Sequence, residues 1–180
     1  MKLRMGMLAV ACWSAALFAT QVSSQQDKNQ RPSPPAQAKC DLGGGKTLTV
    51  DYSSPRAKGR KIMGGLVPYG QVWRAGANEA TTFVTDADLN VGGTTVPAGK
   101  YTIFAVPEES KWSLVISKKA GEWGTAYPGP SEDLARIDMK VSKTPAMVED
   151  FTIAFDKSGS GCTLRMEWEN TRASVEIARK

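Results

Sequence analysis

One short segment, residues 72–81, brings four side chains of different chemistry together. They are Trp73, Arg74, Asn78 and Glu79. A guanidinium is a planar fork of donors that matches a carboxylate or a phosphate, and an amide both donates and accepts hydrogen bonds. An indole stacks on sugar rings and other flat ligands. The segment therefore predicts a binding site for a small polar ligand or a cell-envelope glycan.

Further aromatic residues lie just before this segment and within a later loop. Tyr69 precedes the segment, whereas Trp123 and Tyr127 belong to a glycine-flanked loop about fifty residues further on. If the fold brings both loops to one end, these rings add stacking surface to the site. Aromatic residues of β proteins also commonly lie in the core, so a core position remains the alternative for Trp73 and for each of these rings.

The same segment allows two other interpretations. In the first, Arg74 and Glu79 form a buried ion pair and Asn78 caps the turn, so that the group only fixes the conformation of a loop. In the second, Glu79 is the acid or base of a hydrolase and Arg74 is an electrostatic stabiliser. Asp51 or Glu122 would then supply the second carboxylate. The sequence does not set the separation of the carboxylates that this chemistry requires.

The chain contains no histidine. This removes the usual general base, the commonest metal ligand and the ordinary serine or cysteine triad. Oxygen-bearing side chains alternate at Asp86, Asp88 and Asn90. The calcium-binding helix-loop-helix pattern, however, requires glycine and glutamate where this chain has Val91 and Pro97. We therefore expect no metal, no cofactor, and a binding module rather than an enzyme.

The N-terminus has the anatomy of a cleavable secretory signal peptide. Lys2 and Arg4 precede an apolar run over residues 5–19, and small residues follow at 22–24. The run is shorter than the roughly 20 apolar residues that a membrane-spanning helix needs. Lipidation at Cys12 is less expected, because the apolar run continues beyond it. The sequence predicts a periplasmic or secreted protein with no transmembrane segment.

The charge of the mature chain is mildly positive. Removal of residues 1–24 lowers the formal net charge from +5 to +3, because this segment holds two basic residues and no acid. Basic residues cluster at 56–61, whereas a nucleic-acid-binding protein normally concentrates many of them on one element. We expect no nucleic-acid partner. The cluster is either a solvated basic loop or a contact for a phosphate or another anion.

Two cysteines, Cys40 and Cys162, remain after removal of the signal peptide. An even number in an oxidising compartment permits one disulfide, which would tie the start of the folded domain to a strand near its end. In the chain-entropy model, closing a loop of this length contributes roughly 4 kcal/mol to stability. Two free thiols remain the alternative.

The patterning divides the chain into three parts. These are a signal peptide (1–24), a flexible proline-rich linker (25–44) and a β domain (45–180). Within the β domain, two long loops at 53–80 and 118–135 interrupt a series of short strands. Long structured loops in compact domains often carry function, so these two loops are the places to expect a site.

Alternation of apolar and polar residues predicts the strands. They fall at 47–52, 81–85, 89–91, 94–96, 101–106, 112–117, 136–141, 151–156, 162–169 and 173–178. Trp112 and Trp168 lie within such strands and are expected in the core. Strands this numerous bury their apolar faces in packed or closed sheets, so we expect an all-β, single-domain antiparallel β-sandwich, of jelly-roll or immunoglobulin-like topology.

A set of short motifs runs from about Cys40 to the C-terminus. The motifs are Asp51-Tyr52-Ser53-Ser54-Pro55, Lys58-Gly59-Arg60, Gly64-Gly65-Leu66-Val67-Pro68-Tyr69-Gly70, Val72-Trp73-Arg74 with Gly76-Ala77-Asn78-Glu79-Ala80-Thr81, Pro97-Ala98-Gly99-Lys100-Tyr101-Thr102, and Trp123-Gly124 with Tyr127. Together they resemble a bacterial family known as domain of unknown function 2911. The resemblance implies an exported bacterial domain and brings no assigned activity or catalytic residue. Ala75 stands where the family pattern has threonine, which removes one hydroxyl from the predicted site.

Overall fold

The computed structural model describes residues 30–121 and 126–180. The predicted signal peptide and the predicted site residue Trp123 lie outside these described residues. Within them, no helix is long and apolar enough to cross a membrane.

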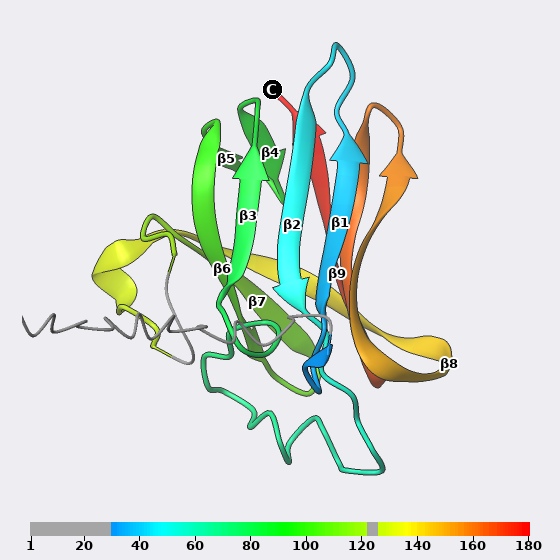
Figure 1. Cartoon of the computed structure of the whole chain (residues 1–180). Coiled ribbons are helices and arrows are strands. Elements are labelled where there is room, and N and C mark those ends of the chain that lie inside the picture. Colours follow the sequence, from blue (N-terminus) through cyan, green and yellow to red (C-terminus); the bar gives the residue numbers. More distant parts are fainter. Residues whose placement is uncertain (1–29, 122–125) are drawn as a thin grey trace, which may run out of the picture.

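The described chain is almost entirely β-structure, as predicted (Figure 1). Its strands are β1 (Pro35–Asp41), β2 (Thr47–Ser53), β3 (Thr81–Thr85), β4 (Leu89–Val91), β5 (Thr94–Val96), β6 (Gly99–Pro107), β7 (Lys111–Ser117), β8 (Asp133–Ser158) and β9 (Gly161–Arg179). They form one antiparallel sheet in the order β1-β2-β3-β6-β7-β8-β9-β4-β5. The prediction of a single all-β domain is confirmed, and hydrogen bonding runs without a break through this sheet.

The alternation that predicts the strands also explains which face they bury. In β2, Leu48 and Val50 are fully buried, whereas Asp51, which follows Val50 and points to the opposite face, is exposed. Trp112 of β7 and Trp168 of β9 lie in the core, as expected. The apolar face of each strand therefore packs against the interior of one curved sheet.

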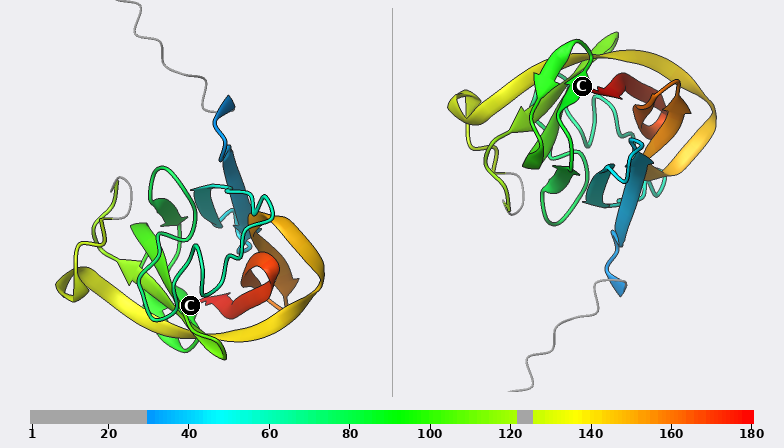
Figure 2. Two further views of the ribbon diagram at one scale, coloured as in Figure 1. Left: turned by 90° about the horizontal axis from the view of Figure 1, so that it is seen from below. Right: turned by 90° about the horizontal axis from the view of Figure 1, so that it is seen from above.

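The two longest strands give the sheet its curvature. β8 and β9 pair at residues 140–143 with 171–174 and again at 152–158 with 161–167, with shifts of register between the two blocks. Such irregularities bend a strand. Figure 2 shows β8, in yellow to orange, sweeping around the domain from β7 toward β1. Strands that are distant in the sheet order therefore face one another across a shared core.

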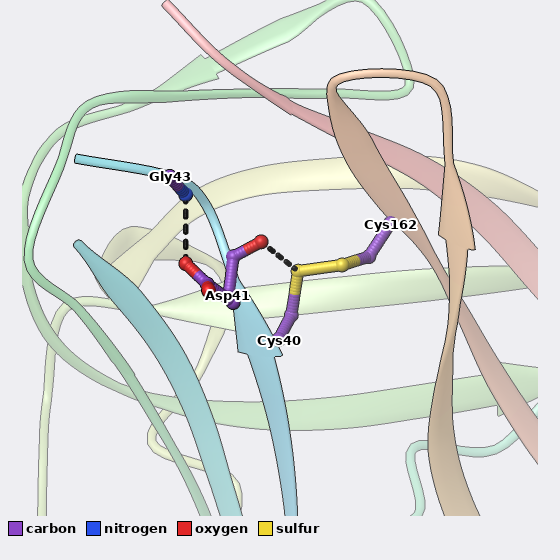
Figure 3. Close-up of a disulfide and its surroundings, with 4 residues drawn as sticks. All are labelled: Cys40, Asp41, Gly43 and Cys162. Carbon is purple, nitrogen blue, oxygen red and sulfur yellow. Dashed lines mark hydrogen bonds between the residues drawn. A yellow bond between two sulfur atoms is a disulfide. The ribbon is translucent and has the colours of Figure 1, made fainter. Parts of the chain in front are cut away.

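A disulfide joins two of these distant strands, as predicted. Cys40 of β1 is bonded to Cys162 at the start of β9, with a Cα–Cα distance of 6.4 Å and a sequence separation of 122 (Figure 3). Both cysteines are buried. In the adjoining turn, the Asp41 carboxylate accepts a 2.8 Å hydrogen bond from the Gly43 N–H. The disulfide holds the edge strand β1 against the hairpin of β8 and β9.

The position of β1 corrects the predicted linker, which was expected to extend from residue 25 to residue 44. All seven residues of β1 pair with β2, from Pro35 opposite Ser53 to Asp41 opposite Thr47. Ala38 and Cys40 point into the core. Because β1 buries only small apolar residues, its alternation is weak in the sequence. The folded domain therefore begins before residue 45.

Candidate functional site

The long loop 54–80 contains the predicted site and is fastened to the sheet at Trp73. The Trp73 N–H and C=O both pair with Ala105 of β6, each at 2.8 Å. The Trp73 ring stacks on Trp168, with centroids 5.8 Å apart and an interplanar angle of 20°, and meets Phe151 edge-on at 4.8 Å. In Figure 1 the loop, in teal, lies at the end of the sheet opposite the C-terminus. Trp73 is therefore anchored in an aromatic cluster rather than held on a mobile loop.

A tight turn follows directly after Arg74. The Thr81 hydroxyl donates a 2.8 Å hydrogen bond to the Ala75 carbonyl, and the Ala77 N–H donates to the Ser53 carbonyl at 3.2 Å. Gly76 has a φ of 156°, and a Cβ there would lie 3.0 Å from the Ser53 carbonyl oxygen. Only glycine therefore fits this turn. The turn and the Trp73 anchor fix the backbone of Arg74 from both sides.

A cavity of about 510 Å³ opens between this loop and the sheet. It is lined by Ser33, Pro55, Arg60, Leu66, Val67, Pro68, Gln71, Val72, Trp73, Arg74, Gly76, Ala77 and Trp168. Two indoles and several aliphatic side chains form an apolar surface, and two guanidiniums and one primary amide supply polar groups. Among the residues that the structure describes, no acidic residue lines it. Its size and composition match those of small-molecule sites.

Arg74 is the most unusual group in this lining. Its Nε atom is buried and has no hydrogen-bond partner, and within the described ranges the guanidinium forms no ion pair. Burial lowers the pKa of Arg74 from its ordinary value, because desolvation disfavours the charged form. A buried donor without a partner costs about 1 to 3 kcal/mol, and more when it is charged. The guanidinium is thus partly stripped of water and not neutralised by the part of the protein that the structure describes.

Asn78 and Glu79 hold the N-terminal segment instead of lining this cavity. The Asn78 Nδ2 donates a 2.9 Å hydrogen bond to the Ser33 carbonyl. The Glu79 carboxylate accepts two hydrogen bonds from Arg31 Nη1, at 2.9 and 3.1 Å. The predicted alternative of an ion pair between Arg74 and Glu79 is therefore wrong, because Arg74 forms none among the described residues. Since Ser33 lines the cavity, Asn78 and Glu79 support one of its walls.

Glu79 also lines a smaller, separate cavity of about 170 Å³, together with Asp51. This arrangement bears on the carboxylate pair that a hydrolase would use. The Asp51 carboxylate accepts a 2.7 Å hydrogen bond from Gln37, and Glu79 is held by Arg31. Both carboxylates are thus engaged with side chains of the protein. The other predicted partner, Glu122, lies outside the described residues.

The remaining aromatic residues do not join the main cavity. Tyr69 is 40% exposed, and its ring packs beside Gly64, where a Cβ would lie 2.8 Å from Tyr69 Cε2. The Tyr127 hydroxyl lies 2.8 Å from both carboxylate oxygens of Asp133 and accepts a 2.7 Å hydrogen bond from Arg136 Nη2. Neither tyrosine lines the cavity. Of the predicted ligand-binding residues that the structure describes, Trp73 and Arg74 are the two that do.

Two important wall residues were not among the predicted site residues. Trp168 was expected in the core, and it does lie there with only 1% of its surface exposed, while it also belongs to the lining of the cavity. Arg60 belongs to the basic cluster 56–61, whose position relative to Arg74 has no signature in the sequence. Ala75, in contrast, is fully buried and does not line the cavity, so the threonine-to-alanine difference removes no hydroxyl from the cavity wall.

The alternating oxygen ligands at residues 86–90 stabilise turns. Asp86 accepts hydrogen bonds from the N–H and the hydroxyl of Thr47, Asp88 accepts one from the Ala98 N–H, and Asn90 accepts one from the Gly93 N–H. In the part of the chain that the structure describes, no three His, Cys, Asp or Glu side chains group in a way that could hold a metal ion.

Comparison with known proteins identifies a family, but the description of that family names no activity. No curated protein and no solved structure shows a significant match to the chain. The family described as Protein of unknown function (DUF2911) matches residues 33–177. This range covers β1 to β9 almost completely, including the whole of the loop 54–80. The chain therefore belongs to the DUF2911 family.

Proposed function

We propose that this protein is an exported binding module that holds a small polar ligand with an acidic group in the cavity under the loop 54–80. The observation that carries the proposal is the Arg74 guanidinium, which lines the cavity with a buried Nε that has no hydrogen-bond partner. An arginine of this kind is completed by a carboxylate or a phosphate, which accepts two parallel hydrogen bonds from the guanidinium.

The surroundings of Arg74 favour a ligand with a flat or apolar body. Trp73 supplies indole surface, with the almost fully buried Trp168 stacked on it, and Leu66, which is 49% exposed, lies at the same cavity. Aromatic faces bind sugar rings and other planar groups at low conformational cost. The Gln71 amide can donate to or accept from a polar substituent. A small organic acid or an acidic glycan fragment fits this combination.

The lining supports binding better than catalysis. In the described part of the chain, its lining holds one hydroxyl group, that of Ser33, and no carboxylate or thiol that could act as a base beside it. Export is supported by the predicted signal peptide and by the disulfide between Cys40 and Cys162, because disulfides persist in oxidising compartments.

A hydrolase that uses Glu79 with Asp51 is the second candidate. One observation favours it, namely that both carboxylates line the cavity of about 170 Å³. The test is hydrolysis of chromogenic glycosides by the wild-type protein and by Glu79→Gln. Turnover that the substitution abolishes would support the hydrolase. If the wild-type protein shows no turnover, the hydrolase is excluded for these substrates and the binding module remains the proposed function.

The binding proposal is tested by titration of the tryptophan fluorescence with benzoate. Arg74→Met removes the cation and retains an apolar stem, and Arg179→Met is the matched control at the opposite end of the sheet. We expect Arg74→Met to weaken binding at least about tenfold, because hydrogen bonds to charged groups contribute about 1.5 to 3 kcal/mol. The control should bind like the wild type. A folded Arg74→Met protein with unchanged affinity would contradict the proposal and favour a purely structural loop.

A further inference from the structure

The basic cluster of the loop 54–80 forms a second hollow beside the main cavity. This hollow, of about 350 Å³, is lined by Pro32, Ser33, Arg56, Lys58 and Arg60. Ser33 and Arg60 line the main cavity as well. The two hollows therefore adjoin, and Arg60 is common to both. The cluster at residues 56–61, which the sequence leaves open between a solvated loop and an anion contact, lies next to Arg74.

The backbone of this cluster is fixed by hydrogen bonds. The Ala57 N–H donates to the Glu149 carbonyl at 2.9 Å, and the Lys58 N–H donates to the Glu149 carboxylate at 2.7 Å. Arg60 donates from Nε to the Ala57 carbonyl at 3.0 Å and from Nη2 to the Arg56 carbonyl at 2.7 Å. The guanidinium of Arg60 is thus held in one orientation by two carbonyl groups, which leaves its remaining N–H groups for another acceptor.

The charge of the two hollows is positive. Arg56, Lys58, Arg60 and Arg74 line them, and no acidic residue of the described chain lines either one. Arg56 lies 3.1 Å from the Asp150 carboxylate, in a pair that is half exposed on both sides. Within residues 30–121 and 126–180, Lys58, Arg60 and Arg74 form no ion pair. Three cations without an ion pair among the described residues therefore line the connected hollows, while the two nearby carboxylates are engaged, Glu149 by the Lys58 N–H and Asp150 by Arg56.

We infer that the ligand carries a phosphate group, or an equivalent dianion, on a planar or apolar body. This inference rests on the proposed function and narrows its ligand class. A carboxylate carries one negative charge and is satisfied by a single guanidinium fork. A phosphate monoester carries about −1.5 to −2 charges and three acceptor oxygens at neutral pH, and so it matches several cations. The phosphate binds at Arg60, with Lys58 on one side and Arg74 on the other, and the body lies against Trp73.

The test is a comparison of phenyl phosphate, benzoate and inorganic phosphate as ligands, by titration of the tryptophan fluorescence. Phenyl phosphate should bind at least about tenfold more tightly than benzoate, because it gains charge-assisted hydrogen bonds at the basic cluster. It should also bind more tightly than inorganic phosphate, which lacks the apolar ring.

Two variants assign the difference to the cluster. Lys58→Gln removes the ammonium group but keeps the backbone N–H, which donates a hydrogen bond to Glu149. Arg60→Gln removes the guanidinium that is common to both hollows. Lys58→Gln should weaken phenyl phosphate binding at least about threefold while leaving benzoate binding within about twofold, because Lys58 is in the lining of the second hollow and not in that of the main cavity. Arg60→Gln, at a residue of both linings, should weaken phenyl phosphate binding more than benzoate binding. The two substitutions together should lower the affinity for phenyl phosphate to about the affinity for benzoate.

The outcomes separate this inference from the proposed function. If benzoate binds through Arg74 but phenyl phosphate binds no more tightly, the phosphate inference is wrong and the binding module stands. If neither probe binds the wild-type protein, the proposed function fails as well. Binding to phosphatidylglycerol vesicles without binding to phenyl phosphate would also overturn the inference, because it would show a membrane surface contact in place of a small-molecule site.

Discussion

Two groups of arginines in this protein differ in how their charge is balanced. On β9, Arg165 and Arg172 both form ion pairs with Glu167, whose side chain is only 7% exposed. Arg165 also lies 2.9 Å from the Asp156 carboxylate. At the cavity, in contrast, Arg60 and Arg74 belong to a lining in which the described residues include no carboxylate. The first group is neutralised within the fold, whereas the second is not.

The contrast shows which arginines serve the fold and which are available to a ligand. A buried charge with its partners in place contributes to a defined structure, and removing one partner is strongly destabilising. A desolvated charge without a protein partner costs stability, and it is retained where a function requires it. The group around Glu167 therefore supports the fold, and Arg74 is the residue that we propose to serve a ligand.

The largest expected effect is on the group around Glu167. Glu167→Gln leaves two partly buried arginines without their shared carboxylate, and we expect it to lower the free energy of unfolding by about 3 kcal/mol. Urea denaturation measures the change. The exposed Glu109→Gln is the control and should change stability by less than about 0.5 kcal/mol. Equal small losses in both variants would remove the distinction between the two groups of arginines.

A ligand that neutralises Arg74 should stabilise the protein. At a free concentration of phenyl phosphate one hundred times its Kd, we expect the free energy of unfolding to rise by about 2.7 kcal/mol, because the ligand binds only the folded state. In Arg74→Met the same concentration should have a much smaller effect. The measurement is urea denaturation with and without the probe. Equal stabilisation of both proteins would place the binding site elsewhere.

Asn78 should matter to the cavity wall rather than to the ligand. Asn78 has a φ of 56°, so aspartate, which also tolerates this conformation, is the suitable replacement. Asn78→Asp removes the donor to the Ser33 carbonyl, and we expect it to cost about 1 kcal/mol in thermal denaturation. Binding should weaken only a few-fold. A loss of affinity as large as that of Arg74→Met would make Asn78 a direct ligand contact.

A smaller effect is expected at Glu79. Its ion pair with Arg31 is partly exposed, with side chains 36% and 23% accessible, so solvent weakens the interaction. Glu79→Gln should cost less than about 1 kcal/mol, as measured by urea denaturation. A cost above about 2 kcal/mol would show that Glu79 belongs with Glu167 as a carboxylate that supports the fold.

The sequence could predict the parts of this arrangement that depend on local pattern. Alternation in β2 and β7 indicates the sheet, and the two cysteines left after signal removal indicate the disulfide. Trp73 and Arg74 could be proposed together, because unlike functional groups crowd beside Gly76. These features have a local or countable signature.

The remaining parts depend on contacts between distant residues. The partners of Asn78 and Glu79 lie 45 and 48 residues earlier in the chain, at Ser33 and Arg31, and no spacing rule connects them. Trp168 has the pattern of a core residue, and only the packed structure reveals that it also belongs to the lining of a cavity. Tertiary packing therefore decided which of the predicted site residues could meet a ligand.

The central claim, that Arg74 serves a ligand and not the fold, is tested most directly by the free energy of unfolding of Arg74→Met in the absence of ligand. Arg172→Met, which removes an ion pair to Glu167, is the comparison. We expect Arg172→Met to lose about 1 to 2 kcal/mol, because its side chain is partly exposed. Arg74→Met should be at least as stable as the wild type, because it removes a desolvated, unneutralised cation. A loss in Arg74→Met equal to that in Arg172→Met would contradict the account.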